Sequence, residues 1–316
     1  MIPIIFMHYG NAPYLRQTMR AASITNPQSR RILLGDSTNA KTAKSCEWEH
    51  FLFDGFTSEK HREFLSVYKR ISGRSHGKHK SGRDWVKFVF ERWFFVEQFC
   101  LKNSINEFYS FDSDTIIATD LSAFVPYFSQ FDCTCQCNGI CLNGYVKIKT
   151  LSAYTRHIIN LFKDEAFLAG LQHEFDTINP GYAFTEMRAF ENFRLRSGSS
   201  AMPHLENMIS GWWFDDCLMQ DDDFITDRVP FTKSAVKRVT YSDGVFYGHH
   251  KTLGRVSFAT LNMSWLPPRC ISWALQKLEG AHTPREETMA GDRRLYISQA
   301  GTHLLRNISS VRKRFR

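Results

Sequence analysis

Short apolar runs alternate with amphipathic segments along the first third of the chain. Residues 2–7, IPIIFM, are short, continuous and apolar, as expected of a buried strand. Asn11 and Pro13 then suit the beginning of a helix, and a second strand, RRILLGD, ends at Asp36. Strand, helix and strand at this spacing predict a βαβ unit, and therefore a parallel sheet with helices on its faces.

The longest amphipathic segment, residues 83–104, predicts a helix with one broad apolar stripe. The stripe consists of Trp85, Val86, Val89, Phe90, Trp93, Phe94, Val96 and Phe99. The run NEFYSFDSD, residues 106–114, follows as a strand that ends in Asp112 and Asp114. Ligands of open α/β sheets collect at the carboxyl ends of strands, so these two aspartates are candidate site residues.

The remaining pattern predicts helices over residues 151–172 and after the turn NPGY, and a strand-rich segment over residues 229–262. From Arg293 onward, apolar residues at spacings of three or four are accompanied by basic ones. Such a helix fits either an anionic membrane surface or a docking position on the protein itself. We therefore expect an α/β protein with a mixed, mostly parallel sheet over residues 1–265 and a helical extension over residues 266–316.

The composition favours a well-packed protein with anionic partners. Aromatic residues make up 14% of the 316 residues, too many for a disordered chain. The net charge of +8 favours phosphates, acidic glycans, nucleic acid or an anionic membrane, although an ordinary basic surface gives the same total. A nucleic-acid-binding protein would interleave basic and aromatic residues, whereas the basic run SGRSHGKHKSGR contains no Phe, Tyr or Trp. Nucleic acid is therefore the less favoured partner.

The eight cysteines are expected to be reduced thiols. The chain starts with a short apolar run without a charged segment before it, and no window is as apolar as a spanning helix, so we expect a cytoplasmic protein. Four of the cysteines form the run CTCQCNGIC, residues 133–141. The paired CxxC spacing of zinc and iron–sulfur sites is absent there, so buried positions on one face of a strand are the favoured interpretation.

Asp112 and Asp114 are two residues apart, which places both carboxylates on one face of a straight strand. Such carboxylates repel each other unless a cation lies between them, and Mg²⁺ or Mn²⁺ prefers oxygen ligands. Two other interpretations remain: a surface turn with two solvated acids, and a haloacid-dehalogenase-like phosphatase with Asp112 as its covalent nucleophile. That phosphatase would carry the motif near the N-terminus, with Thr or Val two residues after the second aspartate, where Ile116 stands here.

Several segments together resemble the GT-A-fold, metal-dependent, nucleotide-sugar glycosyltransferases that carry a DxD motif. They are IPIIFMHYGNAPYLRQTMR, RRILLGDSTN, FERWFFVEQFCLKNSINEFYSFDSD and DLSAF, within roughly residues 1–125. The resemblance implies a GT-A (Rossmann-like) sheet, a UDP- or GDP-sugar donor, a Mn²⁺ or Mg²⁺ cofactor, and a glycan or lipid-linked acceptor. If the basic tail bound the cytoplasmic face of an anionic membrane, the enzyme would lie close to the lipid-linked acceptors used in polysaccharide biosynthesis.

The family's site residues fall on matching positions of this chain. Asp114 would ligate the metal directly, and Asp112 would contact the ribose or reach the metal through water. Asp36 would contact the base or ribose, although a turn before STN explains it equally well. The other positions expected to bind the nucleotide-sugar are His8, Tyr9, Gly10, Asn11 and Ser113.

The C-terminal half matches the family less closely. Glu186 lies where such enzymes often place an acidic residue near the acceptor, so it is a candidate for acceptor binding or for a general base. A surface glutamate at the start of a helix is the plainer interpretation. Asp215 and Asp216 are alternatives to Glu186 for this role, although an exposed acidic turn is the commoner explanation of such a pair.

Related enzymes frequently supply a late histidine as a further metal ligand. Asn262 stands in that region here, so either its amide oxygen binds the metal or His249 or His250 replaces the missing histidine. Lys251 and Arg255 follow directly, and either would contact the diphosphate as a positive charge. A satisfied structural histidine and a solvated basic loop are the alternatives.

Overall fold

The computed structural model describes residues 1–77, 84–198, 201–220, 223–229, 235–280 and 287–291. These residues form two compact units. The first unit consists of Met1–Asn11, Gln28–Ser113 and Leu121–Asn207, and the second unit consists of Ala12–Pro27, Asp114–Asp120 and the chain from Met208 onward. The boundary between the units cuts the DSD motif, because Ser113 ends a segment of the first unit and Asp114 begins a segment of the second.

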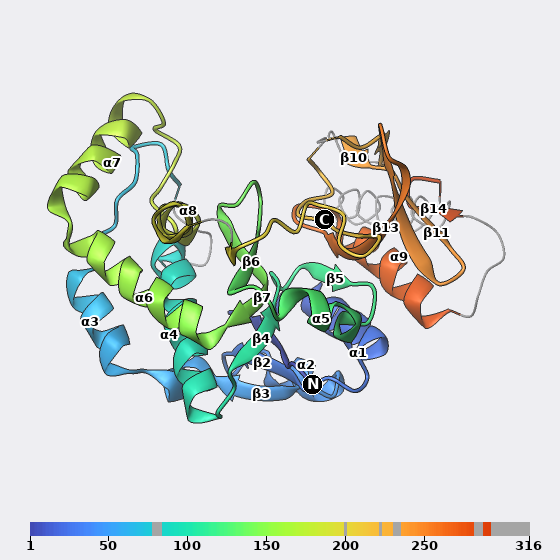
Figure 1. Ribbon diagram of the computed structural model, residues 1–316, viewed down its shortest axis with the longest axis horizontal. Coiled ribbons are helices and arrows are strands. Elements are labelled where there is room, and N and C mark those ends of the chain that lie inside the picture. Colours follow the sequence, from blue (N-terminus) through green and yellow to red (C-terminus); the bar gives the residue numbers. More distant parts are fainter. Residues whose placement is uncertain (78–83, 199–200, 221–222, 230–234, 281–286, 292–316) are drawn as a thin grey trace, which may run out of the picture. The chain divides into compact units, whose positions relative to one another are not determined.

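A mixed six-stranded sheet organises the first unit (Figure 1). The first four strands in spatial order are parallel, and the last two are antiparallel to their neighbours. In that order the strands are β3 (Glu49–Leu52), β2 (Arg31–Gly35), β1 (Ile4–Met7), β4 (Glu107–Ser110), β7 (Cys141–Lys147) and β6 (Cys133–Gln136). The predicted α/β class with a mixed, mostly parallel sheet is therefore confirmed.

The helix α4 (Trp85–Lys102) carries the broad apolar stripe that the sequence predicts. Asp84 caps its first turn by accepting a hydrogen bond from the backbone N–H of Lys87. Figure 1 shows α4 next to α3 (Glu59–Val67) and α6 (Ile148–Lys163), and it contacts both. The first unit also contains α2 (Ala40–Ser45), α5 (Val125–Phe128), α7 (Glu165–Thr177), α8 (Glu186–Ser197) and short 3₁₀ turns at Phe53–Phe56 and Leu121–Phe124.

One predicted helix is divided in the structure. Residues 151–172 were expected to be continuous, but α6 ends at Lys163 and α7 begins at Glu165. Asp164 lies between them and accepts a hydrogen bond from the backbone N–H of Phe167, 2.9 Å away. The carboxylate therefore caps the start of α7, which a pattern of apolar spacing does not reveal. The helix predicted after NPGY is confirmed as α8.

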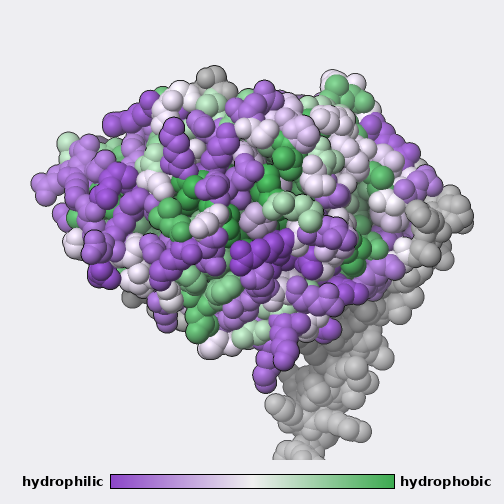
Figure 2. Space-filling model, turned by 60° about the horizontal axis from the view of Figure 1, so that its bottom comes forward, coloured by the Kyte–Doolittle hydropathy of each residue, from purple (hydrophilic) through white to green (hydrophobic). Residues whose placement is uncertain are grey.

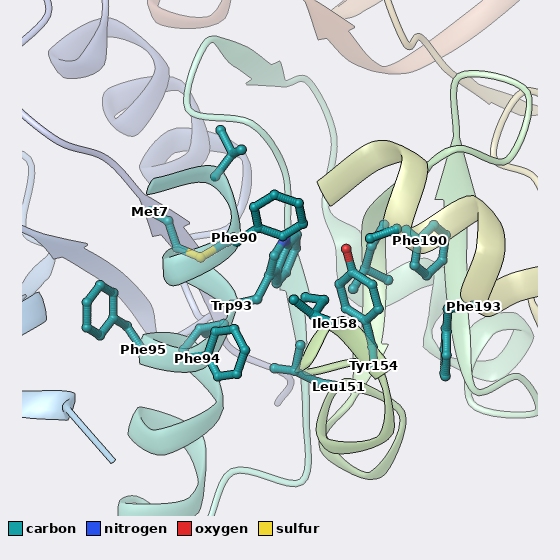
Figure 3. Close-up of a cluster of buried hydrophobic side chains, with 14 of the residues drawn as sticks. Met7, Phe90, Trp93, Phe94, Phe95, Leu151, Tyr154, Ile158, Phe190 and Phe193 are labelled. Carbon is teal, nitrogen blue, oxygen red and sulfur yellow. The ribbon is translucent and has the colours of Figure 1, made fainter. Parts of the chain in front are cut away.

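The core of the first unit is built from aromatic side chains on α4, α6 and α8 (Figure 3). Trp93 of α4 meets Tyr154 of α6 edge to face, with ring centroids 6.3 Å apart. Tyr154 in turn meets Phe190 of α8 at 5.4 Å. Edge-to-face pairs of this kind each contribute roughly 0.5–1.5 kcal/mol beyond the area they bury. The high aromatic content of the chain therefore serves mainly to fix these helices to one another and to the sheet.

The cysteine run forms the edge strand β6 and the turn that follows it. Cys133 and Cys135 are fully buried, as expected, and burial raises the pKa of both thiols. Cys137 departs from the expected strand, because its φ of 55° places it in the turn to β7. All eight cysteines are free thiols.

Over its described residues, the second unit is a predominantly antiparallel sheet with two helices. The strands lie in the order β14 (Glu287–Thr288), β11 (Val239–Ser242), β12 (Val245–His250), β13 (Gly254–Asn262) and β5 (Thr115–Ile117). The strand β8 (Trp212–Phe214) pairs with β13 in parallel, and β9 (Thr226–Arg228) pairs with β10 (Ala235–Lys237). The strands β10, β11, β12 and β13 confirm the strand-rich segment predicted for residues 229–262.

The helices that the structure describes in the second unit are α1 (Leu15–Thr25) and α9 (Pro268–Glu279), which contact each other. The predicted βαβ unit is thus present in part: β1 and β2 pair in parallel, but α1, the helix between them in sequence, packs with α9 and β5. Asn11 is not the N-cap of α1, because Tyr14 occupies that position and Asn11 accepts a hydrogen bond from Thr42.

The structure divides the chain differently from the predicted boundary at residue 265, since α9 belongs to the same unit as β13. The basic helix predicted from Arg293 lies outside the described residues. Among the residues that the structure describes, no helix is both long and apolar enough to cross a bilayer. On the face shown in Figure 2, hydrophilic residues predominate and hydrophobic residues form small groups between them.

Candidate functional site

Arg92 joins two of the predicted site residues of the first unit. Its Nη1 lies 3.0 Å from Oδ1 of Asp112, and its Nη2 lies 3.0 Å from Oε1 of Glu186. Arg92 projects from α4, Asp112 follows the carboxyl end of β4, and Glu186 is the first residue of α8. Two consecutive elements, α4 and β4, and the much later helix α8 therefore meet at one guanidinium group. We call these three residues the Arg92 cluster.

Burial gives the Arg92 cluster unusual acid–base properties. The side chain of Glu186 is 12% exposed, and burial raises the pKa of its carboxyl to about 7, with Arg92 opposing the rise and Asp112 adding to it. Burial also disfavours the charge on Arg92, but the carboxylates of Asp112 and Glu186 outweigh that effect and raise its pKa. Glu186 thus changes protonation near neutral pH, which is where a general base or acid works best.

Asp112 is the accessible member of the Arg92 cluster. Its side chain remains 48% exposed although Oδ1 is bonded to Arg92, whereas the Arg92 side chain is 15% exposed. Glu186 is further held from its backbone, because the hydroxyl of Tyr154 donates a 2.7 Å hydrogen bond to the Glu186 carbonyl. The cluster therefore contains one half-exposed carboxylate, that of Asp112, and one buried carboxyl group, that of Glu186, whose backbone is held by Tyr154.

Sequence reasoning selected Asp112 and Glu186 but did not select Arg92. The only sequence feature that could have indicated Arg92 is its position between Phe90 and Trp93, within the apolar stripe of a helix that is buried along most of its length. Arginine side chains commonly extend from such positions to solvent, so the residue carried no clear sign of a site. Only the approach of β4 and α8 identifies it.

The carboxylate of Asp36 holds the loop that follows β1. Its Oδ2 accepts a 2.8 Å hydrogen bond from the backbone N–H of Gly10, and its Oδ1 accepts one from the backbone N–H of Thr38. Gly10 has a φ of 80°, which glycine adopts without strain. Both carboxylate oxygens are thus used within the protein, which favours the interpretation of Asp36 as a turn residue over direct contact with a ribose.

The same loop is tied to the DSD motif. Nδ1 of His8 lies 2.8 Å from Oγ of Ser113, the residue directly after Asp112. Burial lowers the pKa of His8 to about 4, with Asp36 acting in the opposite direction, so the imidazole is neutral at physiological pH. The Tyr9 ring packs against Phe88, with centroids 4.6 Å apart. Of the predicted nucleotide-binding residues, the structure thus brings His8, Gly10, Asp36 and Ser113 into one hydrogen-bonded arrangement.

Asp114 is fixed within the second unit by the end of β13. Oγ of Ser264 donates a 2.9 Å hydrogen bond to Oδ2 of Asp114, and the backbone N–H of Met263 donates one to the Asp114 carbonyl. Asn262 is opposite Thr115 in the β5–β13 pairing, so it lies close to Asp114. Its side-chain oxygen, however, accepts a hydrogen bond from the backbone N–H of Ser264.

The structure does not bring His249 and His250 to Asp114. These histidines pair with Arg255 and Gly254 at one end of β13, whereas Asn262 marks the other end. The seven residue steps from position 255 to position 262 span about 23 Å of extended strand. Asp114, His249 and His250 therefore cannot ligate one metal ion, and the predicted ligand set is corrected accordingly.

The histidines and the basic residues near them have structural partners. Nδ1 of His250 accepts a 3.2 Å hydrogen bond from the backbone N–H of Thr252. The guanidinium of Arg255 lies over the ring of Tyr247, 3.6 Å from its centroid. Lys251 adjoins the same end of β13, so neither Lys251 nor Arg255 lies beside Asp114 to contact a diphosphate held there.

Asp215 and Asp216 form a buried ion cluster with Lys237. The Lys237 side chain is 0% exposed, and its Nζ lies 2.9 Å from Oδ1 of Asp215 and 3.3 Å from Oδ1 of Asp216. Burial raises the pKa of Asp215 to about 6, although Lys237 opposes the rise. The exposed acidic turn considered from the sequence is therefore wrong. Because Oδ2 of Asp215 also accepts the backbone N–H of Asn262, the cluster positions the end of β13 rather than providing an accessible base.

The donor atoms of the motif suit a hard cation, since both aspartates offer carboxylate oxygens and Asp112 is half exposed. Within the described ranges, no group of three or more His, Cys, Asp or Glu side chains is arranged to hold a metal ion.

Two cavities of the first unit, of about 730 and 970 Å³, are lined by neither Asp112 nor Glu186. The chain matches no protein-family model, and a search of curated proteins also finds no match.

Proposed function

We propose that the protein is a glycosyltransferase of the GT-A type. It would transfer a sugar from a UDP- or GDP-sugar donor to a hydroxyl of a glycan or lipid-linked acceptor. The observation that carries the proposal is the Arg92 cluster, in which Asp112 of the DSD motif and Glu186 share one guanidinium. An accessible carboxylate and a carboxyl with a pKa of about 7 then lie at the carboxyl end of a central parallel strand, where α/β folds bind ligands.

The residues of the cluster have distinct parts in this proposal. Glu186, when deprotonated, accepts the proton of the acceptor hydroxyl as that oxygen attacks the sugar. Arg92 fixes the orientation of the Glu186 carboxylate and keeps Asp112 beside it. Asp36 and His8 hold the loop after β1 and the side chain of Ser113 in place, so that the nucleotide meets an ordered surface.

Asp114 would ligate a Mn²⁺ or Mg²⁺ ion, and Asp112 would contact the ribose or the ion's water. When bound, such an ion neutralises the charge of the departing diphosphate. Ser264 orients the Asp114 carboxylate for that role through its hydrogen bond to Oδ2. His249 and His250 have no part in the proposal, because β13 separates them from Asp114.

Ligand-dependent thermal shifts test the proposal. UDP, GDP and CMP are added to the wild-type protein with and without Mn²⁺, and we expect a shift with UDP or GDP that depends on the metal. Asp114→Asn removes the ligand charge and should abolish the metal-dependent part of the shift. Ser264→Ala is the matched control, because it removes only the hydrogen bond to Asp114 and should weaken the shift without abolishing it.

Two results would contradict the proposal. The first is a wild-type protein that binds none of the three nucleotides in the presence of Mn²⁺. The second is an Asp114→Asn variant that responds to nucleotide and Mn²⁺ as the wild type does, because the metal would then be held elsewhere.

A further inference from the structure

Trp265 has a backbone conformation that its side chain does not favour. The turn after β13 runs from Met263 to Leu266 and is closed by a 3.0 Å hydrogen bond from the Leu266 N–H to the Met263 carbonyl. Trp265 is the third residue of this turn, and its φ is 61°. A positive φ at that position ordinarily selects glycine or asparagine, because a Cβ atom crowds the backbone there. Folding therefore strains this residue.

The Trp265 side chain gains no burial in return. It is 81% exposed, whereas its neighbours Met263 and Leu266 are 1% and 7% exposed and belong to the hydrophobic core of the second unit. The two buried neighbours hold the turn, and the indole is left on the surface. A large aromatic residue that is both strained and exposed is unfavourable for folding, and such outliers concentrate at functional sites.

The turn lies directly beside Asp114. Ser264, which precedes Trp265, donates its hydroxyl hydrogen to Oδ2 of Asp114, and the Met263 N–H donates to the Asp114 carbonyl. All of these residues belong to the second unit. Trp265 therefore directly follows the residue that bonds to the Asp114 carboxylate. In the proposed function that carboxylate is the metal ligand.

We propose that Trp265 is a specificity-determining residue whose indole face binds a pyranose ring. The apolar C–H face of such a ring can pack flat on an indole, while the sugar hydroxyls at its edge remain in water. Because tryptophan is rigid and already exposed, the contact needs neither desolvation of a charge nor a change of fold. The inference rests on the proposed function, since that function supplies the sugar, either on the donor or on the acceptor.

Three variants separate a sugar-binding role from a structural one. Trp265→Gly removes the ring and also relieves the strain of the positive φ. Trp265→Phe keeps an aromatic face. Leu253→Ala is the matched control, because Leu253 is 57% exposed and lies in the turn before the opposite end of β13. Each variant is compared with the wild-type full chain.

We expect Trp265→Gly to melt at the same or a higher temperature than the wild type, while its binding on a glycan array falls by about tenfold or more. Trp265→Phe should retain part of the binding, and Leu253→Ala should retain all of it. Titrations distinguish the source of the sugar. A donor contact lowers the affinity for UDP-glucose, UDP-N-acetylglucosamine or GDP-mannose but not for UDP or GDP, whereas an acceptor contact raises only the acceptor KM.

The inference is overturned if Trp265→Gly binds glycans, nucleotide-sugars and nucleotides as tightly as the wild type. It is also overturned if the only loss is in binding to vesicles of phosphatidylserine and phosphatidylcholine, which would make Trp265 a membrane contact. A wild-type protein without a metal-dependent response to UDP or GDP would instead contradict the proposed function. If glycan binding still depended on Trp265 in that case, the proposed sugar contact of Trp265 would be supported although the proposed function is contradicted.

Discussion

Arg92 is the residue on which the arrangement of the candidate site depends. Replacing it with methionine keeps most of the side-chain volume but leaves Asp112 and Glu186 facing each other without a cation. We expect Arg92→Met to lower the free energy of unfolding by about 1–3 kcal/mol. Urea denaturation followed by circular dichroism measures this loss.

The matched control for that variant is Arg156→Met. Arg156 pairs with Glu63, but its side chain is 47% exposed, so the pair is screened by water. The control should lose less than about 1 kcal/mol. Equal losses in the two variants would show that the Arg92 cluster is no more than another surface ion pair.

Glu186 should make stability and activity respond to pH in opposite directions. The pKa of this carboxyl rises from its ordinary 4.5 to about 7 on folding, so the folded state prefers the protonated form. The free energy of unfolding should therefore decrease as the pH rises from about 4.5 through 7, by on the order of 3 kcal/mol. If Glu186 is the base, transfer activity should increase over the upper part of the same range.

Glu186→Gln tests this prediction, because glutamine keeps the size of the side chain and cannot ionise. The free energy of unfolding is measured by urea denaturation at pH 5 and at pH 8. Its difference between the two pH values should be smaller for the variant than for the wild type. Glu191→Gln removes a carboxylate from the same helix, where Glu191 is 32% exposed and pairs with Arg188, and is the matched control. If the free energy of unfolding depended on pH in the same way in the wild type and in Glu186→Gln, the pKa of Glu186 would not be raised.

At the scale of elements, Lys237 joins β10 to the segment after β8. Its buried ammonium group contacts both Asp215 and Asp216, so removing it leaves two carboxylates in a buried environment. We expect Lys237→Met to lower the free energy of unfolding by about 3–5 kcal/mol. Adding Asp215→Asn and Asp216→Asn to this variant should recover part of the loss, because no charge is then buried.

Arg238→Met is the control for this prediction, because Arg238 is the next residue and pairs with Asp227 while 40% exposed. It should cost less than about 1 kcal/mol in thermal or urea denaturation. If Lys237→Met costs no more than Arg238→Met, the buried ion cluster does not hold these strands together.

Sequence patterns located most of the elements of the chain. The strands β1, β2 and β4 and the helix α4 were predicted from continuous apolar runs and from a broad apolar stripe. The break between α6 and α7 was missed, because the cap at Asp164 depends on one side-chain hydrogen bond and leaves the apolar spacing unchanged. The pairing of β5 with β13 was also missed, because strands of this kind find their partners through contacts between distant residues.

At the scale of the whole molecule, the α/β class and the mixed sheet followed from the order of strand and helix patterns. The division into two units did not, since the second unit collects three separate segments of the chain. A sequence predicts that α1 will be a helix, but its contacts with β5 and α9 depend on distant residues such as Ile117 and Ser272, which are 92 and 255 positions from their α1 partners. Such contacts leave no trace in the local apolar spacing.

The chain alone therefore determined the main strands and helices, the DSD motif at a strand end, and the candidate acids Asp112, Asp114 and Glu186. These are local properties, because periodicity and strand ends are contained in a few neighbouring residues. Only the tertiary structure decided that Arg92 lies between Asp112 and Glu186, which come from positions 20 and 94 residues away. It also decided that His249 and His250 of β12 pair with the end of β13 that is opposite Asn262, since strand register depends on residues that meet only after folding.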